Sequence, residues 1–143
     1  MGSRSASALL QLPVRLRGIR LAQPVDLLLD TASWRALGFV VLCGDDTTRF
    51  LPYAAARPGP DDIAVGSALT LLEDVEFYRR RSESLREVIG LPVRRGAAPL
   101  GTLRDVLLGE DGVASALAVD RPDGPGRVDP GGVLVASGRA SAA

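Results

Sequence analysis

Three consecutive arginines that follow two aromatic residues are the part of this chain best suited to chemistry: Phe77, Tyr78, Arg79, Arg80 and Arg81. Guanidinium groups hold phosphate and carboxylate oxygens with paired hydrogen bonds, and a neighbouring aromatic ring adds a stacking surface. The functional interpretation is a patch that binds RNA phosphates, an acidic protein segment or lipid headgroups. The alternative is a solvated helix face, because Glu76 and Glu83 stand three or four residues from Arg79 and Arg80, the spacing of intrahelical ion pairs.

A second basic pair and the lone tryptophan complete the set of candidate partner-binding residues. Arg94 and Arg95 precede a turn at Gly96. They would either contact a partner or guard a strand edge against pairing with another chain. Trp34 is either an anchor in a binding surface or a packing residue. Both interpretations stay open for each group at the level of sequence.

Composition excludes several classes of chemistry. The basic residues are 17 arginines, with no lysine and no histidine, which rules out Schiff-base chemistry, the phosphate-loop lysine and every histidine-dependent mechanism. Seventeen acidic residues balance them to a formal net charge of zero, so we expect no direct DNA binding. The single cysteine, Cys43, allows no internal disulfide, and we expect it to be an inert buried thiol rather than a redox or nucleophilic group.

The acidic residues do not indicate a catalytic or metal site. Asp45–Asp46 and Asp61–Asp62 fall in expected turns, where aspartate is favoured for backbone hydrogen bonding. Asp26 and Asp105 differ, because each stands among leucines and valines at a matching place in the chain. If either is buried, it must accept hydrogen bonds, and the backbone amides of a neighbouring turn are the expected donors. We therefore expect no catalytic residue, no cofactor and no metal ligand.

The elements that position these residues are predicted to be mainly short strands. Gly- and Pro-rich turns separate apolar runs such as 39–42, 49–51 and 63–65, a spacing typical of a small β-barrel or sandwich. One helix is expected over 71–89, which has no Gly or Pro and repeats apolar residues in steps of four and three. Thr70 with Glu73 fits a capping box at its start.

The chain also repeats its own outline, from about 17 to 73 and again from about 89 to 137. Gly18 and Gly90 open the two copies, and each is followed by a strand-like run that contains Asp26 or Asp105. Eight residues lead from Gly18 to Asp26 and 15 from Gly90 to Asp105, so the first copy is expected to lack seven residues of its opening hairpin. Repeats of this kind decide the architecture before local patterns do.

The two copies resemble the PRC-barrel family of small β-barrels. In the second copy, Ile89–Val93, Pro99–Leu103 and Asp105–Leu108 are similar to the opening strand, the Leu-Gly hairpin return and the Asp-containing strand of the family. In the first copy, Arg49–Ala55 and Ile63–Val65 are similar to its Leu-Pro segment and closing strand. The resemblance implies two small, incomplete barrels that pack as an internal pseudo-dimer. It implies an assembly or interaction role rather than a shared active site.

The expected organisation is a flexible N-terminus (1–13), a first PRC-barrel-like repeat (14–70), a linking helix (71–88), a second repeat (89–137) and a flexible tail (138–143). The expected function is a non-enzymatic adaptor or scaffold for a protein or ribonucleoprotein partner. The alternatives are a small-ligand binder or enzyme that uses the groove between the barrels, or a self-associating protein that forms a homodimer. No membrane span or signal peptide is visible, so we expect a cytoplasmic protein.

Overall fold

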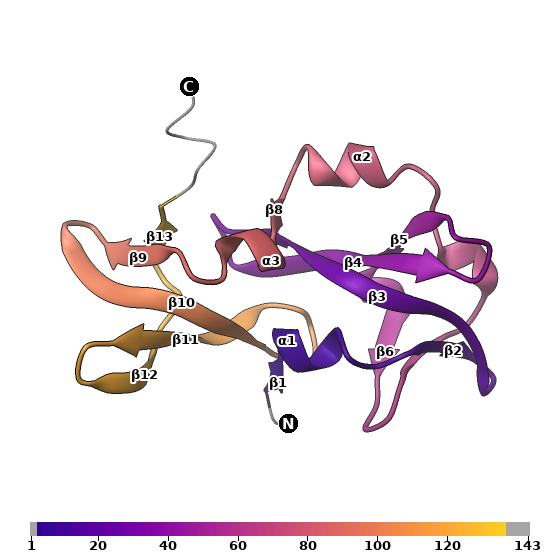
Figure 1. Ribbon diagram of the computed structural model, residues 1–143, viewed down its shortest axis with the longest axis horizontal. Helices are drawn as coiled ribbons and strands as arrows, with labels where there is room; N and C mark the ends of the chain where they lie inside the picture. The colour runs from indigo at the N-terminus through magenta and orange to yellow at the C-terminus, as the bar shows by residue number, and fades with distance from the viewer. Residues whose placement is uncertain (1–2, 137–143) are drawn as a thin grey trace.

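The computed structural model describes residues 3–136, and its secondary structure is mainly strand in two sheets (Figure 1). The first sheet has the order β5-β4-β3-β2-β7-β6 and comprises β2 (Val14–Leu16), β3 (Ile19–Asp30), β4 (Arg35–Cys43), β5 (Thr48–Pro52), β6 (Ala56–Pro58) and β7 (Ile63–Val65). The second has the order β12-β11-β10-β9-β13 and comprises β9 (Pro92–Arg95), β10 (Ala98–Leu108), β11 (Ala114–Arg121), β12 (Gly124–Val128) and β13 (Val133–Val135). The mainly β class predicted from sequence is confirmed, but residues 3–136 form no closed barrel.

Short elements join and cover the sheets. Two two-residue strands lie off the main paths, β1 (Arg4–Ser5) and β8 (Glu83–Ser84). The helices are α1 (Ala6–Leu9), α2 (Val75–Arg79) and α3 (Leu85–Val88), with 3₁₀ turns at Tyr53–Ala55 and Ala68–Thr70. All strand pairs are antiparallel except β2 with β7.

One hydrophobic core spans both sheets. Leu27, Phe39 and Leu51 of the first sheet belong to the same buried cluster as Leu103 and Leu117 of the second. The side chains are largely aliphatic, as the composition requires, and alternate residues of each strand face inward. The two halves therefore share this main core rather than each burying its own.

Trp34 joins the two sheets at their point of contact. Its indole Nε1 donates to the carbonyl oxygen of Val133 at 3.0 Å, and its own carbonyl oxygen accepts from the amide of Ala114 at 2.8 Å. The amide of Ala36 donates to the carbonyl oxygen of Gly112 at 2.8 Å. The start of β4 is thus hydrogen-bonded to the β10–β11 turn.

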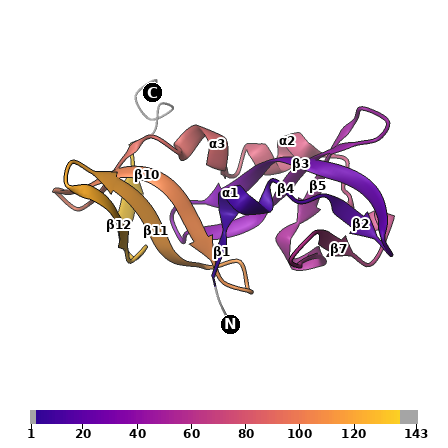
Figure 2. The same ribbon diagram turned by 60° about the horizontal axis from the view of Figure 1, so that its bottom comes forward.

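The two halves exchange their leading segments. The β1–α1 segment precedes β2 in the chain, yet β1 pairs with β10 of the second sheet, with Ser5 opposite Leu107. The β8–α3 segment precedes β9, yet β8 pairs with β3 of the first sheet, with Ser84 opposite Leu28. Figure 2 shows the N-terminal segment leaving the second sheet at β1 and reaching the first sheet at β2. Each half is therefore completed by a segment that leads into the other half.

Two equivalent Asp–Ser pairs hold the exchanged segments. Asp26 accepts hydrogen bonds from the hydroxyl of Ser84 and, at 3.3 Å, from the amide of Arg86 at the start of α3. Asp105 accepts from the hydroxyl of Ser5 and, at 3.1 Å, from the amide of Ser7 in α1. Each serine is also the N-cap of its helix. Asp26 is 7% exposed, and the prediction that a buried aspartate here accepts hydrogen bonds is confirmed, although the donors come from β8 and the start of α3 rather than from a turn.

The exchange also corrects the alignment of the repeat. Ser5 and Ser84 are 79 positions apart, as are Pro13 and Pro92, and Asp26 and Asp105. The first copy has its opening hairpin, formed by β2 and β3, in which Arg15 pairs with Arg20. The expected loss of seven residues is therefore wrong, because Gly18 is not the counterpart of Gly90.

Two expectations about the segments outside the predicted repeats are wrong, and a third concerns residues that the structure does not describe. A single helix over 71–88 does not form, because Leu72 pairs with Phe50 of β5 and Ser84 pairs with β3, so both ends are extended. The segment from residue 3 to 13 is no loose end, since Ala6 and Leu9 of α1 are fully buried. The expected flexible tail, 138–143, lies outside the described residues.

Candidate functional site

The aromatic and arginine cluster lies on α2, whose five residues are fixed at the N-terminal end and on one face. The carboxylate of Asp74 caps the helix by accepting from the amide of Phe77 at 3.1 Å. Val75 is 7% exposed and packs in a small second core with Leu28, Val40 and Phe50. The helix is thereby pinned against the outer face of the first sheet, with its remaining side chains directed toward solvent or along the surface.

A continuous stack leads from that small core to the surface. The ring of Tyr78 lies parallel to the buried ring of Phe50, with centroids 3.9 Å apart and planes 9° apart. Phe77 meets Tyr78 edge to face at 5.0 Å, and the Arg81 guanidinium lies 3.8 Å above the Phe77 ring. Arg81 Nη1 also donates to the Phe77 carbonyl oxygen at 2.7 Å. Phe77, which is 40% exposed, is therefore held in one orientation at the surface.

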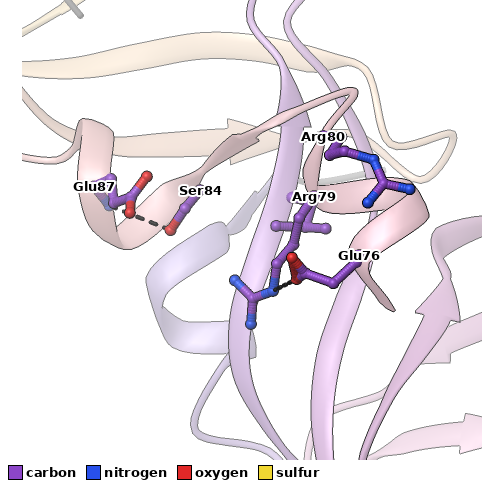
Figure 3. Close-up of a pocket in the computed structure, with 6 residues that line it drawn as sticks. Glu76, Arg79, Arg80, Ser84 and Glu87 are labelled. Carbon is purple, nitrogen blue, oxygen red and sulfur yellow. Dashed lines mark hydrogen bonds and ion pairs between the residues drawn. The ribbon is translucent and has the colours of Figure 1, made fainter. Parts of the chain in front are cut away.

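Arg79 and Arg80 line a pocket of about 360 Å³ between α2 and the β8–α3 segment. Its other lining residues are Leu28, Glu76, Ser84 and Glu87 (Figure 3). Arg79 Nε lies 3.3 Å from a carboxylate oxygen of Glu76, an ion pair within the helix. Figure 3 shows the Arg80 side chain extending in a different direction from that pair. The pocket thus presents charges of both signs.

A second hollow, of about 290 Å³, lies on the other side of Arg80. Arg80 and Arg81 line it together with Asp30 and Glu83. We call Glu76, Phe77, Arg79, Arg80, Arg81 and Glu87 the α2 surface. Of the intrahelical pairs that the sequence suggests, Glu76 with Arg79 is present, whereas Glu83 belongs to β8 and not to the helix. The arginines therefore belong to a surface with two hollows rather than to one face of a long helix.

Arg94 and Arg95 are not part of the α2 surface. Both are exposed on β9, which lies far from α2 in Figure 1. Arg95 Nε donates to the carbonyl oxygen of Gly131 at 2.9 Å, and its Nη2 donates to that of Asp129. Because β9 pairs with β10 on one side and β13 on the other, it is not a free edge, and the edge-guard interpretation is wrong. Arg95 instead holds the loop before β13 against the sheet.

Trp34 is a packing residue. It is 2% exposed, and its indole N–H is hydrogen-bonded to Val133. Its backbone adopts a left-handed conformation with φ of 53°, at the tight turn between β3 and β4. The interpretation of Trp34 as a surface anchor is therefore wrong, and the packing interpretation is confirmed.

Cys43 is a half-buried free thiol at the end of β4. Burial, and secondarily the carboxylate of Asp45, raises the pKa of this thiol above 9.0, while Arg49 opposes the shift. The thiol lines a pocket of about 510 Å³ with Arg49 and Leu72. The expectation of an inert buried thiol is therefore wrong on burial, while the raised pKa disfavours the thiolate, which is the reactive form.

Other signals of chemistry are few in this part of the chain. Within residues 3–136, His, Cys, Asp and Glu side chains nowhere gather in groups of three or more that could hold a metal ion. No helix in the same region has both the length and the apolar character that crossing a membrane demands.

No family model matches the chain, and no curated protein matches it.

Proposed function

We propose that the protein is a non-enzymatic interaction module, an adaptor or scaffold that binds a protein partner through the α2 surface. The proposal rests chiefly on the position of Phe77. A large aromatic ring is held at the surface by an edge-to-face contact with Tyr78 and by the Arg81 guanidinium above it, and Arg81 itself lines one of the two hollows. Aromatic and arginine side chains supply most of the strong contacts in protein interfaces.

The chemistry of the α2 surface favours an acidic protein segment with an apolar side chain. Arg80 borders both hollows and Arg79 and Arg81 border one each, so carboxylates can be received on either side of Arg80. Glu76 and Glu87 stand among the arginines, so the closely spaced charges of a polyanion such as RNA would meet them, whereas a protein segment can place single carboxylates at the arginines alone. A protein segment is therefore favoured over the RNA of a ribonucleoprotein.

We also propose that the two halves are PRC-type repeats fused in one chain. Support comes from the matched placement of Asp26 and Asp105, each on the longest strand of its sheet. The β9–β10 hairpin and the Leu51–Pro52 end of β5 agree with the segments that suggested the family. An assembly role in the cytoplasm belongs to the same proposal.

The test is crosslinking and affinity purification of the tagged chain from its native host, with quantitative mass spectrometry. Two triple variants are compared with the wild type: Arg79→Gln/Arg80→Gln/Arg81→Gln on the α2 surface, and the control Arg104→Gln/Arg121→Gln/Arg127→Gln on the second sheet. We expect recovery of a specific protein partner to fall about tenfold or more in the first variant and to be unchanged in the control.

Phe77→Ala provides an independent check, since it removes the aromatic ring without altering charge. We expect it to reduce partner recovery by a similar factor, because hot-spot aromatics contribute about 2 kcal/mol or more. Equal recovery by the α2 variants and the wild type would refute the α2 surface as the contact. A partner signal that nuclease treatment abolishes would point instead to RNA. Recovery of the untagged chain alone would point to self-association.

A further inference from the structure

A pocket of about 480 Å³ lies between the two halves, away from the α2 surface. The second half and its exchanged N-terminal strand contribute Ser3, Arg4, Gly109 and Glu110. The 3₁₀ turn after β5 and strand β6 contribute Tyr53, Ala56, Arg57 and Pro58. Its volume is in the range of small-molecule sites in proteins. Because Arg4 lies there through the exchange, the pocket exists only when the whole chain has folded.

Tyr53 supplies a buried polar group to this pocket. Its side chain is 6% exposed, and its ring stacks on Phe39 with centroids 5.8 Å apart. Within the described residues, the Tyr53 hydroxyl has no hydrogen-bond partner. Every side-chain nitrogen or oxygen that is fully buried in this region does have one, so the Tyr53 oxygen is not fully buried. The exposed part of the hydroxyl therefore faces the pocket that Tyr53 lines. A phenolic O–H in this position is ready to donate to a ligand.

Arg4 lines the same pocket as Tyr53. Arg4 Nη2 donates to the carbonyl oxygen of Gly59 at 2.7 Å and Nη1 to that of Pro58 at 3.3 Å, which fixes its position in the pocket wall. Burial raises the pKa of Tyr53, the positive charge of Arg4 opposes that shift, and the negative charge of Asp111 adds to it. Arg4 uses only part of its five N–H donors on these carbonyls. The remaining N–H donors of Arg4 and the Tyr53 hydroxyl are available to donate to a ligand in the pocket.

The other charged residues that line the pocket favour a ligand with a single negative charge. Arg57 also lines the pocket, and Glu110 is the one carboxylate residue among its lining residues. In the described part of the chain, none of Arg4, Arg57 and Glu110 forms an ion pair within 4.0 Å. Among the lining residues, two guanidinium groups against one carboxylate leave a balance of one positive charge, and the carboxylate of Asp111 also acts on the Tyr53 hydroxyl. Ala56 and Pro58 add apolar surface beside it.

We propose that this pocket binds a small organic carboxylate, whose oxygens accept hydrogen bonds from the Tyr53 hydroxyl and the Arg4 guanidinium and whose apolar part lies against Ala56 and Pro58. The single negative charge of a carboxylate matches the charge balance of the wall. An inorganic phosphate dianion would meet Glu110 and would leave the apolar wall uncovered. The proposal is independent of the α2 surface and adds a ligand to the adaptor function.

Benzoate is a suitable probe because it combines one carboxylate with a compact apolar ring. The full chain, labelled with ¹⁵N, is titrated with benzoate and followed by two-dimensional amide spectra. We expect saturable shifts concentrated at the amides of Ala56, Arg57, Gly109 and Glu110, with a dissociation constant of about 1 mM for so small a probe. Benzamide, the neutral counterpart, is expected to bind at least about tenfold more weakly, because it lacks the charge that the arginine attracts.

Matched variants locate the site. Tyr53→Phe keeps the ring on Phe39 and removes only the hydroxyl, and it should weaken benzoate binding about tenfold. Tyr78→Phe, the same change at the other tyrosine of the chain, should leave affinity unchanged. Glu110→Gln removes the carboxylate from the wall and should strengthen binding a few-fold.

Three results would overturn the proposal. They are shifts that do not saturate by about 20 mM benzoate, equal binding of benzoate by Tyr53→Phe and the wild type, and equal binding of benzamide and benzoate. The last would mean that the pocket takes apolar rings without recognising an anion. None of the three would bear on the α2 surface, so the ligand site and the adaptor function fail separately.

Discussion

The Asp–Ser pairs make a quantitative prediction, because one carboxylate at each site fixes a segment that belongs to the other half. Asp26 accepts from the Ser84 hydroxyl, from the Arg86 amide at 3.3 Å and from the Leu27 amide at 2.8 Å. Asp26→Ala removes all three interactions at a position that is 7% exposed. We expect the free energy of unfolding to fall and the β8–α3 segment to detach before the rest of the chain.

The magnitude follows from the groups left behind. Losing the acceptor of the Arg86 amide at the start of α3 costs about 1 kcal/mol. Leaving the buried Ser84 hydroxyl without its acceptor costs a further 1 to 3 kcal/mol or so. We therefore expect Asp26→Ala to lower stability by about 3 kcal/mol, a large share of the total for a domain of this size. Asp105→Ala breaks the equivalent bonds to Ser5 and Ser7 at a half-buried site. Water can partly replace those bonds, so the expected loss is about 1.5 kcal/mol.

The assay is equilibrium unfolding in urea, followed by the fluorescence of Trp34, the lone tryptophan, which is buried where the two sheets meet. Asp123→Ala, at an exposed position in the turn between β11 and β12, is the matched control and should change stability by less than about 0.5 kcal/mol. A double-mutant cycle with Ser84→Ala should give a coupling energy of about 1 kcal/mol or more. The reasoning is refuted if Asp26→Ala costs no more than the control, or if Asp26 and Ser84 show no coupling.

Two further predictions concern β4. A Cβ at Gly38 would lie 2.3 Å from the carbonyl oxygen of Leu51, so Gly38→Ala should lower stability by about 3 kcal/mol. The measurement is the melting temperature of each variant. Gly44→Ala, where nothing lies within 4 Å of the added Cβ, should leave stability nearly unchanged, and similar melting temperatures for the two variants would contradict the packing argument. Because the pKa of Cys43 is raised above 9.0, its alkylation by iodoacetamide at pH 8 should be slower in the folded than in the unfolded chain. The folded state holds the thiol proton more tightly than the unfolded state, and this difference contributes to the free energy of unfolding. The contribution is present below pH 9.0 and is lost as pH rises through the folded-state pKa. Arg49→Gln should slow alkylation further and Asp45→Asn should speed it, and the opposite order would refute the assigned causes.

Local signals predicted the parts of the fold that depend on neighbours in sequence. The turn at 44–47 and the strand at 63–65 were predictable because turn residues flank short apolar runs there. The bonding of Asp26 was predictable because a carboxylate among leucines has to be satisfied if it is buried. The α2 surface was found in part, since the sequence singles out Phe77 and the arginines but not the hollows around them.

Long-range pairing accounts for the failures. The periodicity of 71–89 is helical, but Leu72 is drawn into a bridge with Phe50, and Ser84 into one with Leu28. Arg4 and Tyr53 lie 49 positions apart, and neither carries a local signal that would bring them to one pocket. The period of 79 was visible in the sequence, yet the shared glycines at 18 and 90 offered a competing alignment.

The exchange of leading segments also sets the order in which the protein can fold during synthesis. Ser5 must wait for Asp105, 100 positions later in the chain, before it finds its acceptor. At about 5 to 20 residues per second, that delay is of the order of 5 to 20 s. During it, the apolar side chains of Ala6 and Leu9 have no sheet to cover. A ribosome that stalls midway therefore leaves the N-terminus of the nascent chain available to chaperones, or to the second half of another copy.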